Sequence, residues 1–103
     1  MIKGTTPTLH YELDFDTSVI KSAEIVVQYV DANKAVQIVK GMEDCVVGER
    51  CISTSLTQEE TLQLPAPSHV EIQLKILTED EMVLATEITK VSVKRLLKED
   101  VIE

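Results

Sequence analysis

The sequence predicts an all-β domain, and three observations support this prediction. Apolar side chains alternate with polar ones in three segments, short strand-like segments follow one another at regular spacing, and no long amphipathic helix interrupts them. Alternation indicates half-buried strands because a pleated strand sends successive side chains to opposite faces. The three alternating stripes are Leu9-Tyr11-Leu13-Phe15, Ala23-Ile25-Val27-Tyr29 and Val70-Ile72-Leu74-Ile76.

The first half of the chain predicts three strands. They are expected at residues 8–15, 22–30 and 35–39. Pro7 suits the beginning of the first strand because proline lacks a backbone donor. Side-chain oxygens within residues 16–20 can cap a single helical turn before the second strand. Residues 31–34 are typical of a hairpin turn, and Gly41 ends the third strand.

The second half predicts a hairpin followed by two further strands. These strands are expected at residues 43–47, 50–56 and 69–77, and from Met82 onward. Thr57 and Glu60 have the spacing of a capping box, so residues 58–62 are expected to form one helical turn. Pro65 and Pro67 then prevent that helix from continuing.

The last strand contains a change of phase. Apolar residues fall on even numbers at Met82, Leu84 and Ile88 but on odd numbers at Val91 and Val93. A slip of one residue turns every later side chain to the opposite face, so a β-bulge or bend is expected near residues 89–90. We interpret this bulge as architectural.

Together these elements favour an immunoglobulin-like antiparallel β-sandwich of about seven strands, formed by residues 1–103 as a single domain. A chain of 103 residues can bury a core without metal or disulfide help. The side chains expected in that core are Leu9, Tyr11, Leu13, Ile25, Val27, Val70, Ile72, Leu74 and Ile76.

Composition and charge argue against several classes of ligand. The formal net charge is −8 and the aromatic fraction is 3%. Acidic chains repel phosphate backbones, and few rings are available for stacking, so direct nucleic-acid binding and sugar binding are disfavoured. The carboxylates are scattered in short groups, at Glu59-Glu60, Glu79-Asp80-Glu81 and Glu99-Asp100. A DNA mimic would need them gathered on one face.

Two cysteines, Cys45 and Cys51, flank the expected hairpin turn, and we expect them side by side on adjacent strands. We interpret them as reduced thiols of a cytosolic protein, with a disulfide left open. A zinc site would need His10 and His69 as further ligands, but these occupy solvent-facing positions on two different strands. We therefore expect no metal and no cofactor.

No arrangement of residues predicts catalysis. His10 and His69 each precede a carboxylate on the same face, at Glu12 and Glu71, which indicates exposed strand histidines. The paired acids lie in polar turns, where we expect them to keep the loops soluble or to cap a helix. Without a nucleophile beside a base, we expect the protein not to be an enzyme and name no catalytic residue. Since neither a secretory signal nor a membrane span is evident, a cytoplasmic location is expected.

Several turn and strand patterns resemble small proteins encoded in prophages of Firmicutes. They are Gly4-Thr5-Thr6-Pro7-Thr8, Leu13-Asp14-Phe15-Asp16-Thr17, Ile20-Lys21, Thr57-Gln58-Glu59-Glu60-Thr61 and Ile72-Gln73-Leu74. The resemblance spans nearly the whole chain and includes no active-site signature. It implies a phage setting, with association to the virion as a further location.

These observations lead us to expect a phage structural or assembly accessory module that acts through protein-protein contacts. Its expected partners are phage structural proteins or further copies of itself, bound through a sheet edge or face. The first strand and the tail after Val93 are the expected contact regions. The alternative is an acidic inhibitor or DNA mimic that binds a host enzyme.

Overall fold

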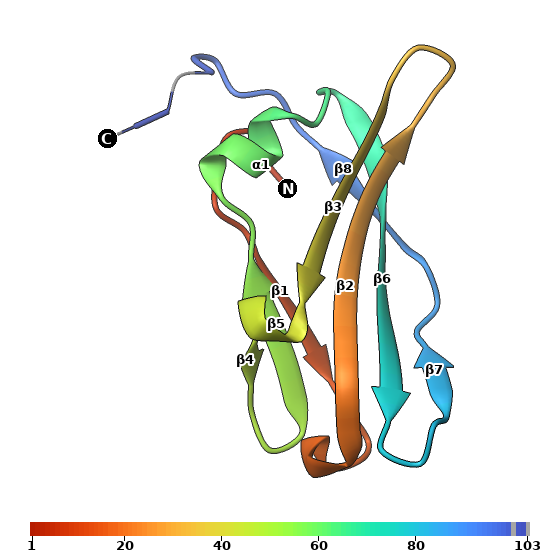
Figure 1. Cartoon of the computed structure of the whole chain (residues 1–103). Coiled ribbons are helices and arrows are strands. Elements are labelled where there is room, and N and C mark those ends of the chain that lie inside the picture. Colours follow the sequence, from red (N-terminus) through yellow and green to blue (C-terminus); the bar gives the residue numbers. More distant parts are fainter. Residues whose placement is uncertain (100, 103) are drawn as a thin grey trace.

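Two antiparallel sheets pack face to face in the computed structural model, which describes residues 1–99 and 101–102 (Figure 1). The smaller sheet has the order β1 (Thr8–Glu12), β5 (Cys51–Ser55) and β4 (Val46–Val47). The larger sheet has the order β3 (Ala35–Gly41), β2 (Ile20–Val30) and β6 (Ser68–Thr78), with β7 (Val83–Ala85) and β8 (Thr89–Val93) both paired to β6. The prediction of an all-β sandwich is confirmed.

The core lies between the sheets and centres on β2 and β6, the two longest strands. Six of the predicted core residues are buried, namely Ile25, Val27, Val70, Ile72, Leu74 and Ile76. Leu9, Tyr11 and Leu13 are only partly buried, so this part of the prediction is wrong. They belong to β1 or follow it directly, and β1 is an edge strand with only β5 beside it, which leaves one flank of these side chains uncovered.

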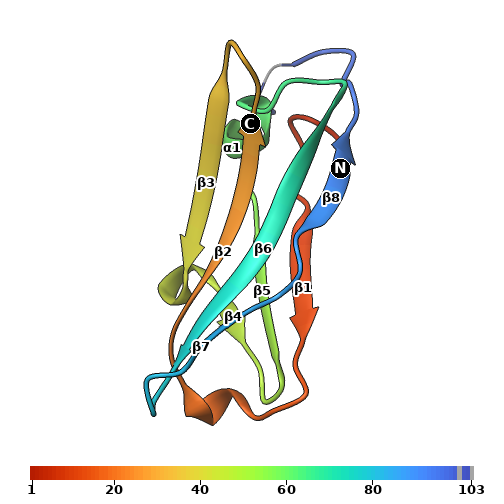
Figure 2. The same cartoon turned by 90° about the vertical axis from the view of Figure 1, so that its right-hand side faces the viewer.

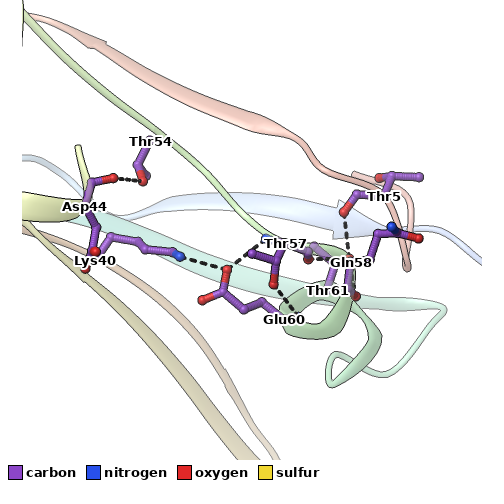
Figure 3. Close-up of polar contacts among 8 residues, drawn as sticks. All are labelled: Thr5, Lys40, Asp44, Thr54, Thr57, Gln58, Glu60 and Thr61. Atoms are coloured by element: carbon purple, nitrogen blue, oxygen red, sulfur yellow. Dashed lines mark hydrogen bonds and ion pairs between the residues drawn. The ribbon is translucent and has the colours of Figure 1, made fainter. Parts of the chain in front are cut away.

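Short helical turns connect several of the strands, and the sequence predicts two of these turns. The 3₁₀ turn η1 (Thr17–Val19) is capped by Asp16, whose carboxylate accepts from the Ser18 N–H at 2.8 Å. Helix α1 (Gln58–Leu62) begins with the complete capping box of Thr57 and Glu60 (Figure 3). Both predictions are confirmed.

A second 3₁₀ turn, η2 (Met42–Asp44), replaces the first half of the strand expected at residues 43–47. The Cys45 N–H donates to the Met42 carbonyl at 3.1 Å, which closes the turn and leaves only two residues for β4. The two cysteines consequently do not face each other. Gly48 lies opposite Cys51 and donates its N–H to the Cys51 carbonyl at 2.9 Å, whereas Cys45 precedes β4. The expected side-by-side placement is therefore wrong.

The seventh predicted strand is two strands, and the change of phase is real. Going from the Lys75–Ala85 pair to the Ile72–Thr89 pair takes three residues along β6 but four along its partner, so one extra residue is inserted. The insertion lies within residues 86–88, slightly before the expected position. Thr86 fills the break, because its N–H donates to the Leu74 carbonyl at 2.9 Å and its hydroxyl accepts from the Leu74 N–H at 3.0 Å.

The molecule is elongated, with principal extents of 46 × 33 × 18 Å, and its two ends differ. We call one end the loop pole, formed by η1, the β4–β5 turn and the β6–β7 turn (Figure 1). The other end is the terminal pole, which holds α1 and both chain termini (Figures 1 and 2). At the terminal pole Ile2 forms a parallel bridge with Lys94, which fixes the first residues beside the end of β8.

Candidate protein-binding site

One side of the sandwich is open. There the smaller sheet ends with the edge strand β1 and the larger sheet ends with β7 and β8, and β1 does not pair with either of them. Figure 2 views the molecule from the side of β7 and β8. Among the described residues, no strand pairs with the outer edge of β1. An unpaired edge offers backbone donors and acceptors to another chain. This open side is the candidate site.

The free backbone groups of β1 can be identified from its ladder. Leu13 donates its N–H to the Arg50 carbonyl at 2.8 Å, and Leu56 donates to the Pro7 carbonyl at 3.0 Å. Because backbone groups alternate in direction along an antiparallel strand, odd-numbered residues of β1 face β5. The N–H and C=O groups of Thr8, His10 and Glu12 therefore point outward.

The same reasoning applies to β7. Thr78 donates its N–H to the Met82 carbonyl at 2.9 Å, and Thr86 donates to Leu74 at the same distance, so even-numbered residues face β6. Val83 and Ala85 consequently direct their backbone groups outward. Because β7 is only three residues long, this edge is short.

A groove of about 400 Å³ runs between the two edges. Its lining residues are Glu12, Leu13, Asp14, Phe15, Leu74, Ile76, Leu84, Ala85 and Thr86. Leu74 and Ile76 belong to the core, so the groove exposes the edge of the hydrophobic interior. A partner side chain placed there would extend the core rather than only touch its surface.

The groove continues at the loop pole into a hollow of about 470 Å³, which we call the end pocket. The end pocket is lined by Phe15, Ser18, Val19, Thr78, Glu79, Asp80, Met82 and Leu84. The groove and the end pocket share Phe15 and Leu84. Three of the apolar side chains are strongly exposed, at 44% for Val19, 56% for Met82 and 38% for Leu84. A cluster of solvent-exposed apolar side chains is typical of a surface that contacts another molecule.

Hydrogen bonds hold the end pocket in shape. Thr17 donates its N–H to the Glu49 carbonyl at 2.9 Å, and Glu79 donates its N–H to the Val19 carbonyl at 2.8 Å. These bonds fasten η1 to the β4–β5 turn and to the β6–β7 turn. Lys21 adds an ion pair with Glu81 at 3.0 Å. These contacts therefore connect the three turns of the loop pole, and the end pocket lies between η1 and the β6–β7 turn.

Carboxylates border the apolar surface of the groove and end pocket. Glu12, Asp14, Glu79 and Asp80 are all exposed and line these hollows. Asp16 lies nearby, and the backbone hydrogen bond from Ser18 lowers the pKa of its carboxyl. The loop pole is therefore negatively charged at neutral pH. An apolar floor with an acidic rim fits an apolar group accompanied by cations.

Tyr11 and Thr86 separate the groove from a smaller hollow toward the terminal pole. Tyr11 belongs to β1 and Thr86 follows β7, and burial raises the pKa of the Tyr11 hydroxyl. Above them a hollow of about 240 Å³ lies between β1 and β8.

The structure brings some of the singled-out residues together and separates others. His10 Nε2 lies 2.8 Å from Glu12 Oε1, as their spacing predicts. His69 lies on β6 in another sheet, so the two histidines do not converge. The described residues contain no group of three or more His, Cys, Asp or Glu side chains placed to hold a metal ion. No described helix is long and apolar enough to cross a bilayer.

The two expected contact regions differ. β1 is an edge strand, as a contact region of this kind requires. The tail after Val93 is attached to the domain, because Lys94 donates its N–H to the Met1 carbonyl at 2.8 Å and Ile102 donates to Gln58 Oε1 at 3.0 Å. Residues 100 and 103 lie outside the described part of the chain.

The end pocket itself was missed by sequence reasoning. Alternation predicts Met82, Leu84 and Ile88 as buried, but all three are exposed, so that prediction is wrong. Met82 and Leu84 lie on the inner face, but in the described part of the chain the smaller sheet does not cover them, and alternation alone cannot reveal where a facing sheet ends. Ile88 follows the inserted residue and therefore lies on the outer face, beside Val26 and Gln73.

Comparison of the chain with protein-family models, curated proteins and solved structures finds no match.

Proposed function

We propose that this β-sandwich is a non-enzymatic protein-binding module whose contact surface is the open side, and that it acts as a structural or assembly accessory protein of a phage. The observation that carries the proposal is the continuous apolar hollow formed by the groove and the end pocket. Its exposed side chains, Val19, Met82 and Leu84, would lose contact with water when a partner binds.

The backbone edges beside the groove support the same function. The outward N–H and C=O groups of Thr8, His10 and Glu12 can pair with a strand of a partner, while the groove accepts its apolar side chains. The strand order also supports an immunoglobulin-like arrangement, since consecutive strands are distributed over two antiparallel sheets. The phage setting is supported by the sequence resemblance alone.

An acidic inhibitor or DNA mimic is the second candidate, and the charge of the loop pole favours it. The carboxylates gathered there are Asp14, Asp16, Glu49, Glu79, Asp80 and Glu81. A surface that imitates a phosphate backbone depends on charge, whereas here Val19 and Met82 lie exposed among the carboxylates. We therefore place protein binding through the apolar hollow first.

Complementation in a phage-producing strain tests the proposed function. A strain that lacks this protein should form fewer infectious particles, and wild-type protein should restore them. Met82→Asp, which places a charge in the end pocket, should fail to restore them. Val46→Asp is the matched control, because Val46 is 73% exposed on β4, at the opposite edge of the smaller sheet.

Mass spectrometry of purified particles should find the wild-type protein and the Val46→Asp variant in them, or in their assembly intermediates, but not Met82→Asp. Thermal unfolding of both purified variants serves as the control that each of them is folded. Normal particle yield without the protein, together with its specific binding to a host enzyme, would overturn the proposal in favour of the inhibitor.

A further inference from the structure

We propose that the end pocket of one molecule binds a second copy of this chain, and that the part inserted is the arch formed by residues 94–99 at the terminal pole. This inference rests on the proposed function and names the partner of the same site. It would make the protein a head-to-tail assembling unit.

The arch presents one apolar side chain to solvent. Leu97 is 101% exposed, the highest value among the large apolar residues of the described chain. Its neighbour Leu96 points to the domain, where its Cδ2 would lie 2.8 Å from a Cβ placed on Gly4. Leu96 therefore fastens the arch while Leu97 projects from it.

Backbone and ion-pair contacts fix the arch on both sides of Leu97. Before it, Lys94 donates its N–H to the Met1 carbonyl at 2.8 Å and accepts from the Lys3 N–H at 3.0 Å. After it, Glu99 pairs with the Lys3 ammonium at 2.9 Å. A constrained segment loses little conformational entropy when it binds, so an arch of this kind is suited to insertion.

Charge complementarity connects the arch to the end pocket. Lys94 and Arg95 precede Leu97, and both are exposed. In the end pocket Glu79 and Asp80 border the exposed apolar side chains, and Asp14 lies in the adjoining groove. A leucine accompanied by cations therefore meets an apolar floor accompanied by carboxylates. Such rim charges favour the correct orientation and partner.

The arch cannot fill the pocket of its own molecule, because the two lie at opposite poles of a sandwich 46 Å long (Figure 1). Binding must then be between copies, with different surfaces in contact on each. A head-to-tail interface of this kind produces a ring if the rotation closes and an open chain if it does not. Either product suits a component of a particle.

Sedimentation velocity of the full chain tests this inference. The weight-average mass of the wild type should rise with concentration at 50 mM NaCl. Leu97→Asp, which removes the inserted side chain, and Met82→Asp, which blocks the pocket, should each weaken association at least about tenfold. Val46→Asp should associate as the wild type does.

Mixing the two defective variants gives a sharper result. The Leu97→Asp molecule keeps a working pocket and the Met82→Asp molecule keeps a working arch, so together they form one intact interface. An equimolar mixture should form a one-to-one dimer and nothing larger. A mixture that stays monomeric would overturn the proposal.

Charge reversal tests the orientation. Arg95→Glu should weaken association roughly tenfold at low salt, and adding Glu79→Arg in the same chain should restore much of it. Raising NaCl to 500 mM should weaken wild-type association and have less effect on Arg95→Glu. Equal association of Arg95→Glu and the wild type would contradict the assigned contact.

The outcomes separate this inference from the proposed function. A wild-type chain that remains monomeric up to millimolar concentration overturns self-association, while failure of Met82→Asp to restore particles would still support protein binding at the pocket. Conversely, self-association with full restoration by Met82→Asp supports the contact between copies and overturns its role in assembly.

Discussion

At the scale of single residues, Thr86 is the residue that completes the hydrogen bonding of β6 on the open side. Leu74 would have an unpaired N–H and C=O where β7 and β8 separate, and Thr86 pairs with both. Its own carbonyl accepts from the Gln73 side chain at 2.8 Å. A break in the ladder is tolerated because buried backbone groups remain hydrogen-bonded.

Replacing Thr86 with valine should therefore destabilise the protein by about 1–3 kcal/mol, since the Leu74 N–H loses its acceptor in a part-buried place. Urea unfolding followed by circular dichroism measures the change. Thr89→Val is the control, because Thr89 is exposed in β8. Equal free energies of unfolding for the two variants would show that the hydroxyl contributes nothing at the break.

The alternation of β6 makes a second prediction at this scale. Leu74 is fully buried, so Leu74→Ala should lower the free energy of unfolding by about 2–5 kcal/mol through lost burial and a cavity. Gln73, on the other face, loses one side-chain hydrogen bond on truncation, which should cost about 1 kcal/mol. Equal losses in urea unfolding would contradict the assigned faces.

At the scale of elements, α1 is too short to be stable alone and depends on its caps and its neighbours. Thr57 and Glu60 satisfy its first donors, and Thr61 donates its hydroxyl to the Thr5 carbonyl at 2.8 Å (Figure 3). Glu60 also pairs with Lys40 of β3 at 2.8 Å. The same carboxylate thus caps a helix and links it to the larger sheet.

The protonation of Glu60 should make stability depend on pH. Burial raises the pKa of its carboxyl, but hydrogen bonds from Lys40 and from the Thr57 N–H outweigh this, and the pKa lies below its ordinary value of 4.5. The ionised form is therefore favoured by folding. Its contribution to stability is present above about pH 4.5 and is lost as the pH falls through the lowered pKa.

Melting curves of Glu60→Gln between pH 7 and pH 3 measure this contribution. The variant should melt below the wild type at neutral pH, and the difference should shrink in acid. Glu59→Gln serves as the control, because Glu59 is an exposed neighbour in the same helix. A difference in melting temperature that stays constant across this range would exclude the ionised carboxylate as its source.

At the scale of the whole molecule, the unequal size of the two sheets creates the open side that we propose for binding. Among the described residues, the larger sheet has five strands and the smaller has three. The smaller sheet therefore leaves part of the larger one uncovered near β7, where the core reaches the surface. Together with the acidic loop pole and the exposed Leu97 at the terminal pole, this gives the molecule two unlike ends, as head-to-tail assembly requires.

The local elements and the central core could be predicted from the amino-acid sequence alone. Alternation identified the buried faces of β2 and β6, because both edges of these strands are paired within the larger sheet and one face is covered by the smaller sheet. The capping residues Asp16 and Thr57 predicted their turns, since capping depends on residues only two or three positions apart. β1 is also an edge strand, as expected for a first strand that could pair with another chain.

Which apolar residues are covered and which remain exposed depends on how the two sheets pack, and the sequence pattern did not predict it. Met82 and Leu84 have the alternation of buried residues, but no strand of the smaller sheet covers them in the part of the chain that the structure describes, and both remain exposed. The two cysteines are likewise kept apart by the register of the β4–β5 hairpin, in which Gly48 rather than Cys45 lies opposite Cys51. Burial at a sheet edge and pairing between strands depend on partners distant in the sequence, and a local pattern contains no information about where those partners end.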